Sequence, residues 1–147
     1  QGEVALAGKQ LGRAEGEFRN AVKRTPRDYA ANLLLAQSLQ AQNKTREAQR
    51  YAEAAKAIYP QEAQSHKLIG ALALGQKDPA AAFAAFDQYD RLLPGDGGIT
   101  FLKGVALEGM GRRQEAARQY SSFLRNNRQG EAAQYAYSRL KGWGYVK

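Results

Sequence analysis

The chain has 147 residues, with 22 lysines and arginines against 14 aspartates and glutamates, and its formal net charge is +8. It contains no cysteine and one histidine, His66, which excludes disulfides, thiolate metal sites, cysteine nucleophiles and any histidine pair for a metal or for acid–base catalysis. The longest apolar stretches fall short of the roughly 20 residues that a membrane span needs. With 44% hydrophobic and 24% charged residues, the composition predicts a folded domain.

A fixed period runs through the chain. Three of the four prolines, Pro26, Pro60 and Pro94, are equally spaced, with about 34 residues from one to the next. An alanine precedes each of them by twelve positions, and one further period reaches Ala116. The spacing lies within the range of about 20–50 residues that is typical of repeat proteins, so it predicts a repeat architecture and outweighs any single local pattern.

The segments between these markers have the composition of helices. Alanine, glutamine, leucine, lysine and arginine are common, and Asp78 before Pro79 is the signature of a helix start. No segment shows the period-two alternation of a strand. In chain order we expect helices at 2–8, 10–24, 28–42, 45–58, 62–76, 79–92, 97–110, 113–127 and 130–141. The glycine-rich segments 95–98 and 109–111 are expected to be turns, since neither has the Lys-Ser/Thr ending of a phosphate loop.

A helix-turn-helix unit of about 34 residues resembles the tetratricopeptide repeat when its second helix has a small residue followed by an aromatic one. A proline in the turn that leaves the second helix, the exit turn, completes the resemblance. The resemblance covers nearly the whole chain. It departs at Ala52, Lys103 and Arg128, where the family has an aromatic residue, a large apolar residue and a proline. The residues that carry it are Ala14, Phe18, Ala21, Pro26, Leu35, Ala36, Ala48, Ala55, Pro60, Ile69, Gly70, Ala82, Phe86, Pro94, Gly104, Leu107, Gly111, Ala116 and Tyr120.

The resemblance implies an all-α fold, a right-handed superhelical solenoid of antiparallel helix pairs that is stabilised by stacking of neighbouring repeats. We expect one solenoid domain. Its parts would be a partial first repeat at 1–28, full repeats at 29–62, 63–96 and 97–130, and a capping helix with a tail at 131–147. The partial repeat suggests a chain cut from a longer array or protein. We expect Trp143 and Tyr145 to fold back on the last helix, the alternative being an exposed hook for another subunit.

The resemblance also implies a non-catalytic protein-interaction scaffold that binds a peptide or a helix in a concave groove lined by the first helix of each pair. Leu34, Leu68 and Leu102 recur once per period at such positions, so the groove is expected to be apolar and its partner an apolar or amphipathic segment. His66 is expected to be a packing residue, and no metal or cofactor is expected. The expected groove residues are Leu33, Leu34, Gln37, Gln64, Lys67, Leu68, Ala71, Phe101, Leu102, Val105, Glu108, Tyr135 and Arg139.

Several alternatives to this groove stay open. Family members that grip a carboxyl-terminal dicarboxylate use Lys, Asn and Arg on successive first helices, and only Lys67 falls at such a place, which disfavours that activity. The apolar stripe could instead be covered by the superhelix itself or by the rest of a parent protein. Self-association is a further possibility, because the partial first repeat would leave an unpaired face.

Two other functions are compatible with the sequence. The closing segment 134–140, with Trp143 and Tyr145, faintly resembles the end of repeat modules of bacterial zinc metalloproteases. The chain would then be an accessory C-terminal module of a larger envelope enzyme, whose HExxH helix lies upstream.

The net charge is +4 over residues 1–56, −2 over 57–110 and +6 over 111–147. Such basic ends indicate either a solvated outer face or contact with acidic protein, nucleic acid or anionic membrane, and no nucleic-acid motif accompanies them. The composition suggests a bacterial source and leaves periplasm and cytoplasm equally open.

Overall fold

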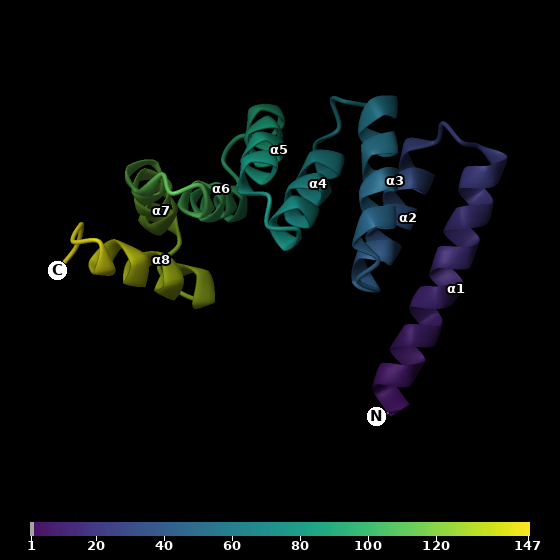
Figure 1. Cartoon of the computed structure of the whole chain (residues 1–147), viewed down its shortest axis with the longest axis horizontal. Coiled ribbons are helices and arrows are strands. Elements are labelled where there is room, and N and C mark those ends of the chain that lie inside the picture. Colours follow the sequence, from purple (N-terminus) through teal and green to yellow (C-terminus); the bar gives the residue numbers. More distant parts are fainter. Residues whose placement is uncertain (1) are drawn as a thin grey trace. The chain divides into compact units, whose positions relative to one another are not determined.

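A computed structural model describes the backbone of residues 2–147 and the side chains of residues 8–147. Over this range the secondary structure consists of α-helices and turns, which confirms the predicted all-α fold. In chain order the helices are α1 (Gly2–Arg24), α2 (Tyr29–Ala41), α3 (Thr45–Ile58), α4 (Ala63–Gly75), α5 (Pro79–Leu92), α6 (Gly97–Gly109), α7 (Arg113–Asn126) and α8 (Glu131–Gly142) (Figure 1).

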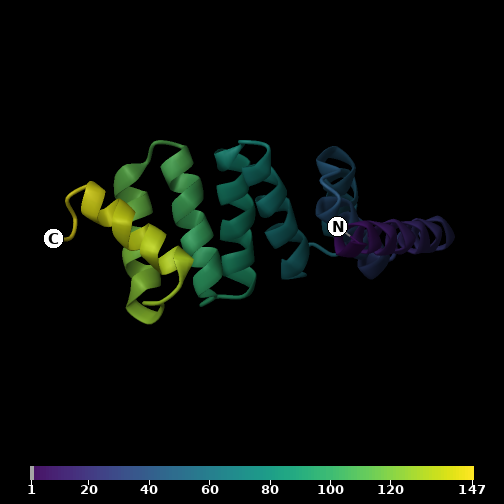
Figure 2. The ribbon, with the colours of Figure 1, turned by 90° about the horizontal axis from the view of Figure 1, so that it is seen from below.

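The chain forms two compact units, which we call unit 1 (residues 1–72) and unit 2 (residues 73–147). In unit 1, α2 packs against both α1 and α3. In unit 2, α6 packs against both α5 and α7, and α8 packs against α7. Figure 2 shows α5, α6 and α7 side by side with short turns between them. Helices that follow one another in the sequence are thus neighbours in space within each unit, as expected of a repeat fold.

The expected helices at 2–8 and 10–24 are a single helix, α1, so the predicted break near Gly8 is wrong. A glycine inside a helix costs about 1 kcal/mol relative to alanine, which weakens the helix without ending it. Helices end at glycine when its φ becomes positive, and Gly8 is not among the positive-φ glycines of the described chain. The segments 45–58 and 79–92 were predicted with the bounds that α3 and α5 have.

Three aspartates start helices by capping their free N–H groups. Asp28 accepts a hydrogen bond from Ala31 N at 3.2 Å before α2, and Asp78 caps α5 through Ala81 N at the same distance. Asp96 precedes α6 and accepts from Gly98 N at 2.9 Å. Each cap satisfies a donor that the helix leaves unpaired and fixes where the helix begins.

The turns inside the helix pairs share one backbone conformation. Asn43 and Lys77 have φ of 61° and 60°, and Gly111, one period after Lys77, has φ of 76°. In each case the next residue donates its N–H to a carbonyl five residues back, as in the bond of 2.9 Å from Arg112 N to Leu107 O. The three turns therefore close their first helices in the same left-handed manner.

A side-chain hydrogen bond to the carbonyl of the proline recurs at two exit turns. Asn32 is buried and its Nδ2 donates to Pro26 O at 3.1 Å, and one period later the Nε2 of His66 lies 2.8 Å from Pro60 O. A carbonyl oxygen can only accept, so Nε2 carries the proton. His66 is 4% exposed and anchors a turn, which agrees with the expectation of a packing residue.

The cores of the two units differ in side-chain size. In unit 1, Ala48, Ala52 and Ala55 of α3 are all 0% exposed, so α2 and α3 approach closely. In unit 2, the core gathers Leu107, Tyr120, Phe123 and Leu140 from α6, α7 and α8. Close approach is also required at Gly104 of α6, because a Cβ there would lie 2.6 Å from Cε1 of Tyr120.

Lys103 shows how the fold accommodates a departure from the family pattern. It is 8% exposed, at a position where a large apolar residue was expected. Its Nζ lies 3.1 Å from Asp87 Oδ1 and 3.2 Å from Asp90 Oδ2, both on α5, and 5.6 Å from the centre of the Phe83 ring. Two carboxylates and an aromatic face thus compensate a buried ammonium group, while its aliphatic stem packs like an apolar residue.

Candidate functional site

The expected groove residues of unit 2 come together on α6 and α8. The Phe101 and Tyr135 rings meet edge to face with centroids 5.9 Å apart, and the Phe101 ring also lies 5.7 Å from that of Tyr120. Tyr135 is 43% exposed. Val105 of α6 is half-buried and packs against the same core, and Leu102 of α6 is also half-buried. An exposed aromatic ring supported by buried ones is a typical anchor for a partner side chain. We call Phe101, Val105 and Glu108 of α6, with Tyr135 and Arg139 of α8, the first-helix face of unit 2.

Glu108 is the polar centre of the first-helix face. Its Oε1 accepts a hydrogen bond of 2.8 Å from the Tyr120 hydroxyl, and its Oε2 pairs with Arg139 Nη2 at 2.7 Å. The Tyr135 hydroxyl donates to Oε2 at 3.3 Å. Burial raises the pKa of both tyrosines, and the neighbouring Glu108 carboxylate raises it further. Both phenols therefore remain protonated donors, and the three groups hold the Glu108 carboxylate in one orientation.

Trp143 completes the cluster from the tail. Its ring stacks on Tyr120 with centroids 6.1 Å apart and an interplanar angle of 19°. The Arg139 guanidinium lies 5.0 Å from the centre of the Trp143 ring and that of Arg113 lies 5.7 Å from it. Trp143 thus folds back on the helices, as expected for both aromatic residues of the tail. Tyr145, in contrast, is 49% exposed.

The remaining predicted residues are not equally accessible. Leu34 is 41% exposed, Leu102 is half-buried, and Leu68 is only 6% exposed. Leu68 therefore presents little side-chain surface to a partner, because most residues of α4 from Ala63 to Ala73 are buried. Leu33 and Ala71 are half-buried, whereas Gln37, Gln64 and Lys67 are exposed.

Sequence reasoning placed Phe101, Val105, Tyr135 and Arg139 on one face but did not assign Tyr120 or Trp143 to it. Tyr120 was counted only as a core residue of the second helix. A signal was available, since its hydroxyl is a polar group that must find a partner when the ring is buried. The acceptor it finds is Glu108 of the neighbouring helix.

The described residues offer neither a metal site nor a membrane-spanning helix. Within this part of the chain, no group of three or more histidine, cysteine, aspartate or glutamate side chains could hold a metal ion. None of the described helices combines the length and the apolar character that crossing a bilayer requires.

Comparison with known proteins identifies the family. The pattern of the tetratricopeptide repeat matches residues 1–40 and 33–97. No curated protein sequence matches the chain. The structure of MamA is similar, with a TM-score of 0.85 at 15% identity over 98% of this chain and 85% of MamA. YrrB gives a TM-score of 0.76 at 16% identity over 86% of this chain and 66% of YrrB.

A third similar structure is a thermophilic tetratricopeptide repeat protein of Thermus thermophilus. It gives a TM-score of 0.71 at 20% identity, over 92% of this chain and 76% of that protein. At such identities these neighbours establish the fold and carry no residue roles. The repeat match over most of the sequence and the helical architecture agree, and the chain belongs to the tetratricopeptide repeat family.

Proposed function

We propose that the chain is a protein-interaction scaffold and that the first-helix face of unit 2 binds a peptide segment of a partner protein. One observation carries the proposal: the exposed Tyr135 ring packs edge to face on Phe101 and shares the Glu108 carboxylate with Arg139, and all three residues were predicted to line the groove. YrrB is a tetratricopeptide repeat protein with an unusual peptide-binding site, and a peptide is the class of ligand that we propose here.

The contacts suggest how the segment is held. An apolar side chain of the partner packs against the Phe101–Tyr135 pair, where burial of an aromatic surface contributes most of the binding energy. The Arg139 side chain is 42% exposed, so guanidinium N–H groups that Glu108 does not engage can donate to an acceptor group of the ligand. Because Glu108 already holds Tyr135 and Arg139, little side-chain entropy is lost on binding.

Photo-crosslinking tests the proposal. We replace Tyr135 with benzoylphenylalanine, express the chain in its native organism, and identify crosslinked peptides by mass spectrometry. Tyr59 of unit 1 is the matched control position, since it is 49% exposed and lies outside the first-helix face. The crosslinked segment is then synthesised and titrated against wild type, Tyr135→Ala and Tyr59→Ala.

We expect Tyr135→Ala to weaken binding at least ~10-fold, as for an aromatic anchor, and Tyr59→Ala to change it less than about two-fold. Equal losses from the two alanine variants would sink the proposal, as would a partner segment that crosslinks only from position 59. Circular dichroism shows whether each variant keeps its helices.

A further inference from the structure

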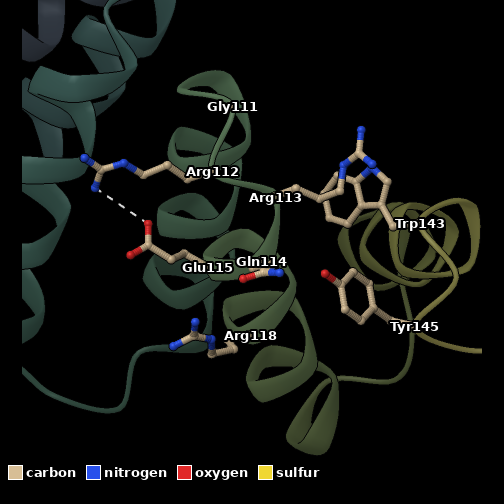
Figure 3. Close-up of a pocket in the computed structure, with 8 residues that line it drawn as sticks. All are labelled: Gly111, Arg112, Arg113, Gln114, Glu115, Arg118, Trp143 and Tyr145. Carbon is tan, nitrogen blue, oxygen red and sulfur yellow. Dashed lines mark ion pairs between the residues drawn. The ribbon is translucent and has the colours of Figure 1, made fainter.

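A surface hollow of about 710 Å³ lies between the start of α7 and the tail after α8. Figure 3 shows Arg113 alongside Trp143 on one side of the hollow and Arg112 turned toward Glu115 on the other. The Arg112–Glu115 ion pair has an N–O distance of 3.6 Å. The wall also includes Arg118 and Tyr145, so cationic and aromatic groups are interleaved here.

Two more hollows continue this surface along α7. A middle hollow of about 500 Å³ shares Gln114, Arg118 and Tyr145 with the hollow of Figure 3. A far hollow of about 560 Å³ shares Ser121 and Arg125 with the middle one. Its floor is apolar, since its lining residues include Leu124, Ala133, Tyr137, Leu140 and Val146. We call the three together the α7 outer surface.

Four polar residues of the α7 outer surface form one stripe on α7. Gln114, Arg118, Ser121 and Arg125 follow one another at alternating steps of four and three residues, and Arg128 lies just beyond the end of α7 and lines the same hollow as Arg125. This spacing keeps side chains on one side of a helix and is the spacing at which a second helix packs alongside. The stripe therefore fits a helical partner in its geometry.

The stripe is also positively charged without internal compensation. Arg118, Arg125 and Arg128 have no ion pair among the residues that the structure describes, and residues 111–147 carry a net charge of +6. One of the two acidic residues of this segment, Glu115, already pairs with Arg112. The complementary ligand is therefore rich in carboxylates.

We propose that the α7 outer surface binds an acidic amphipathic helix of a partner protein. Carboxylates of the partner face Arg118, Arg125 and Arg128, and its apolar side chains enter the hollow of Leu124, Tyr137 and Val146. Trp143 adjoins both surfaces, but Phe101 and Tyr135 belong to the first-helix face alone, so the scaffold holds two partners or two segments of one. The apolar floor favours a protein over nucleic acid, whose phosphates need only the cations.

The probe is a fluorescent 15-residue peptide designed as an amphipathic helix, with glutamates along one edge and leucines along the next. Two control peptides replace every glutamate by glutamine or every leucine by alanine. Binding is followed by anisotropy at about 150 mM NaCl, where long-range attraction between exposed charges is screened. The protein variants are Arg118→Glu with Arg125→Glu, and Arg46→Glu with Lys56→Glu on α3 as the control of equal charge change.

We expect the acidic peptide to bind and the Arg118→Glu/Arg125→Glu variant to lose at least ~10-fold in affinity, with the control pair changing it less than about two-fold. Both control peptides should bind more weakly. The proposal is overturned if the acidic peptide does not bind, or if the two charge-reversal variants lose affinity equally. It is also overturned if a DNA duplex or a phosphatidylserine vesicle binds this surface more tightly than the peptide does.

Discussion

The two units fill equivalent repeat positions with side chains of very different size. Three buried positions of α3 in unit 1 are alanines, and two periods later α7 of unit 2 has one alanine and two aromatic residues. The equivalent pairs are Ala48 and Ala116, Ala52 and Tyr120, and Ala55 and Phe123, and each residue is at most 6% exposed. An aromatic ring buries far more apolar surface than a methyl group, so unit 2 has the larger hydrophobic contribution at these positions.

Both units also contain ion pairs, and one in unit 1 joins α1 to the turn between α2 and α3. The Glu15 carboxylate on α1 lies 2.7 Å from Arg19 Nε, 2.9 Å from Lys44 Nζ and 3.0 Å from Gln42 Nε2. The bonds from Arg19 and Lys44 lower the pKa of Glu15 from 4.5 to about 2. The difference between the units shows that the repeat determines where helices contact each other and leaves open which interaction stabilises the contact.

The largest effect is expected from Tyr120→Ala in unit 2. It removes a fully buried ring and a donor to Glu108, and should lower the free energy of unfolding by about 3–5 kcal/mol. Urea unfolding followed by the fluorescence of Trp143, which stacks on Tyr120, measures the change. Tyr137→Ala is the control, because that ring is 47% exposed and its loss should cost less than about 1 kcal/mol. Similar losses from both would contradict the aromatic core of unit 2.

Two glycine substitutions should have opposite signs. In Gly104→Ala the new Cβ meets the Tyr120 ring at 2.6 Å, and since that ring is buried we expect a loss of about 1–3 kcal/mol. In Gly12→Ala on α1 nothing lies within 4 Å of the new Cβ, so the better helix propensity should stabilise by up to about 1 kcal/mol. Thermal unfolding followed by circular dichroism compares the two. A gain in stability at Gly104 would mean that unit 2 is packed less tightly than described.

The smallest effect concerns pH and unit 1. Because the folded state lowers the pKa of Glu15 from 4.5 to about 2, this carboxylate stabilises the fold above pH 4.5, and the contribution is lost as the pH falls toward 2. The difference in unfolding free energy between wild type and Glu15→Gln should be about 1 kcal/mol at neutral pH and shrink below pH 4.5. Urea titrations from pH 7 to pH 3 measure it, with Glu53→Gln, an exposed residue of α3, as the control. A difference that stays constant with pH would exclude the charge as its cause.

The helices could be predicted from the sequence because their signals are local or periodic. Asp78 and Pro79 are a local signal for a helix start, and the evenly spaced prolines set the register of the repeats. The same register placed Phe101, Tyr135 and Arg139 on one face. What it could not provide is the exposure of individual positions, since Leu34 and Leu68 are equivalent in sequence yet 41% and 6% exposed.

The polar centre of the site was beyond the sequence for a different reason. The bonds that join Glu108 to Tyr120 and Arg139 depend on side chains that reach across from two neighbouring helices. The accommodation of Lys103 by Asp87 and Asp90 is of the same kind. Periodicity marks residues that share a role in each repeat, and these contacts occur once.

The left-handed turn residues Asn43, Lys77 and Gly111 have a consequence for the chain's tolerance of insertions and deletions. Each turn closes with a hydrogen bond across five residues, so its length is fixed by that ring of atoms. One residue more or less would rotate the next helix by about 100° about its axis and carry its apolar side away from its neighbour. Natural variation in length is therefore expected at the chain ends or in whole periods, and single-residue indels at these three turns should be selected against.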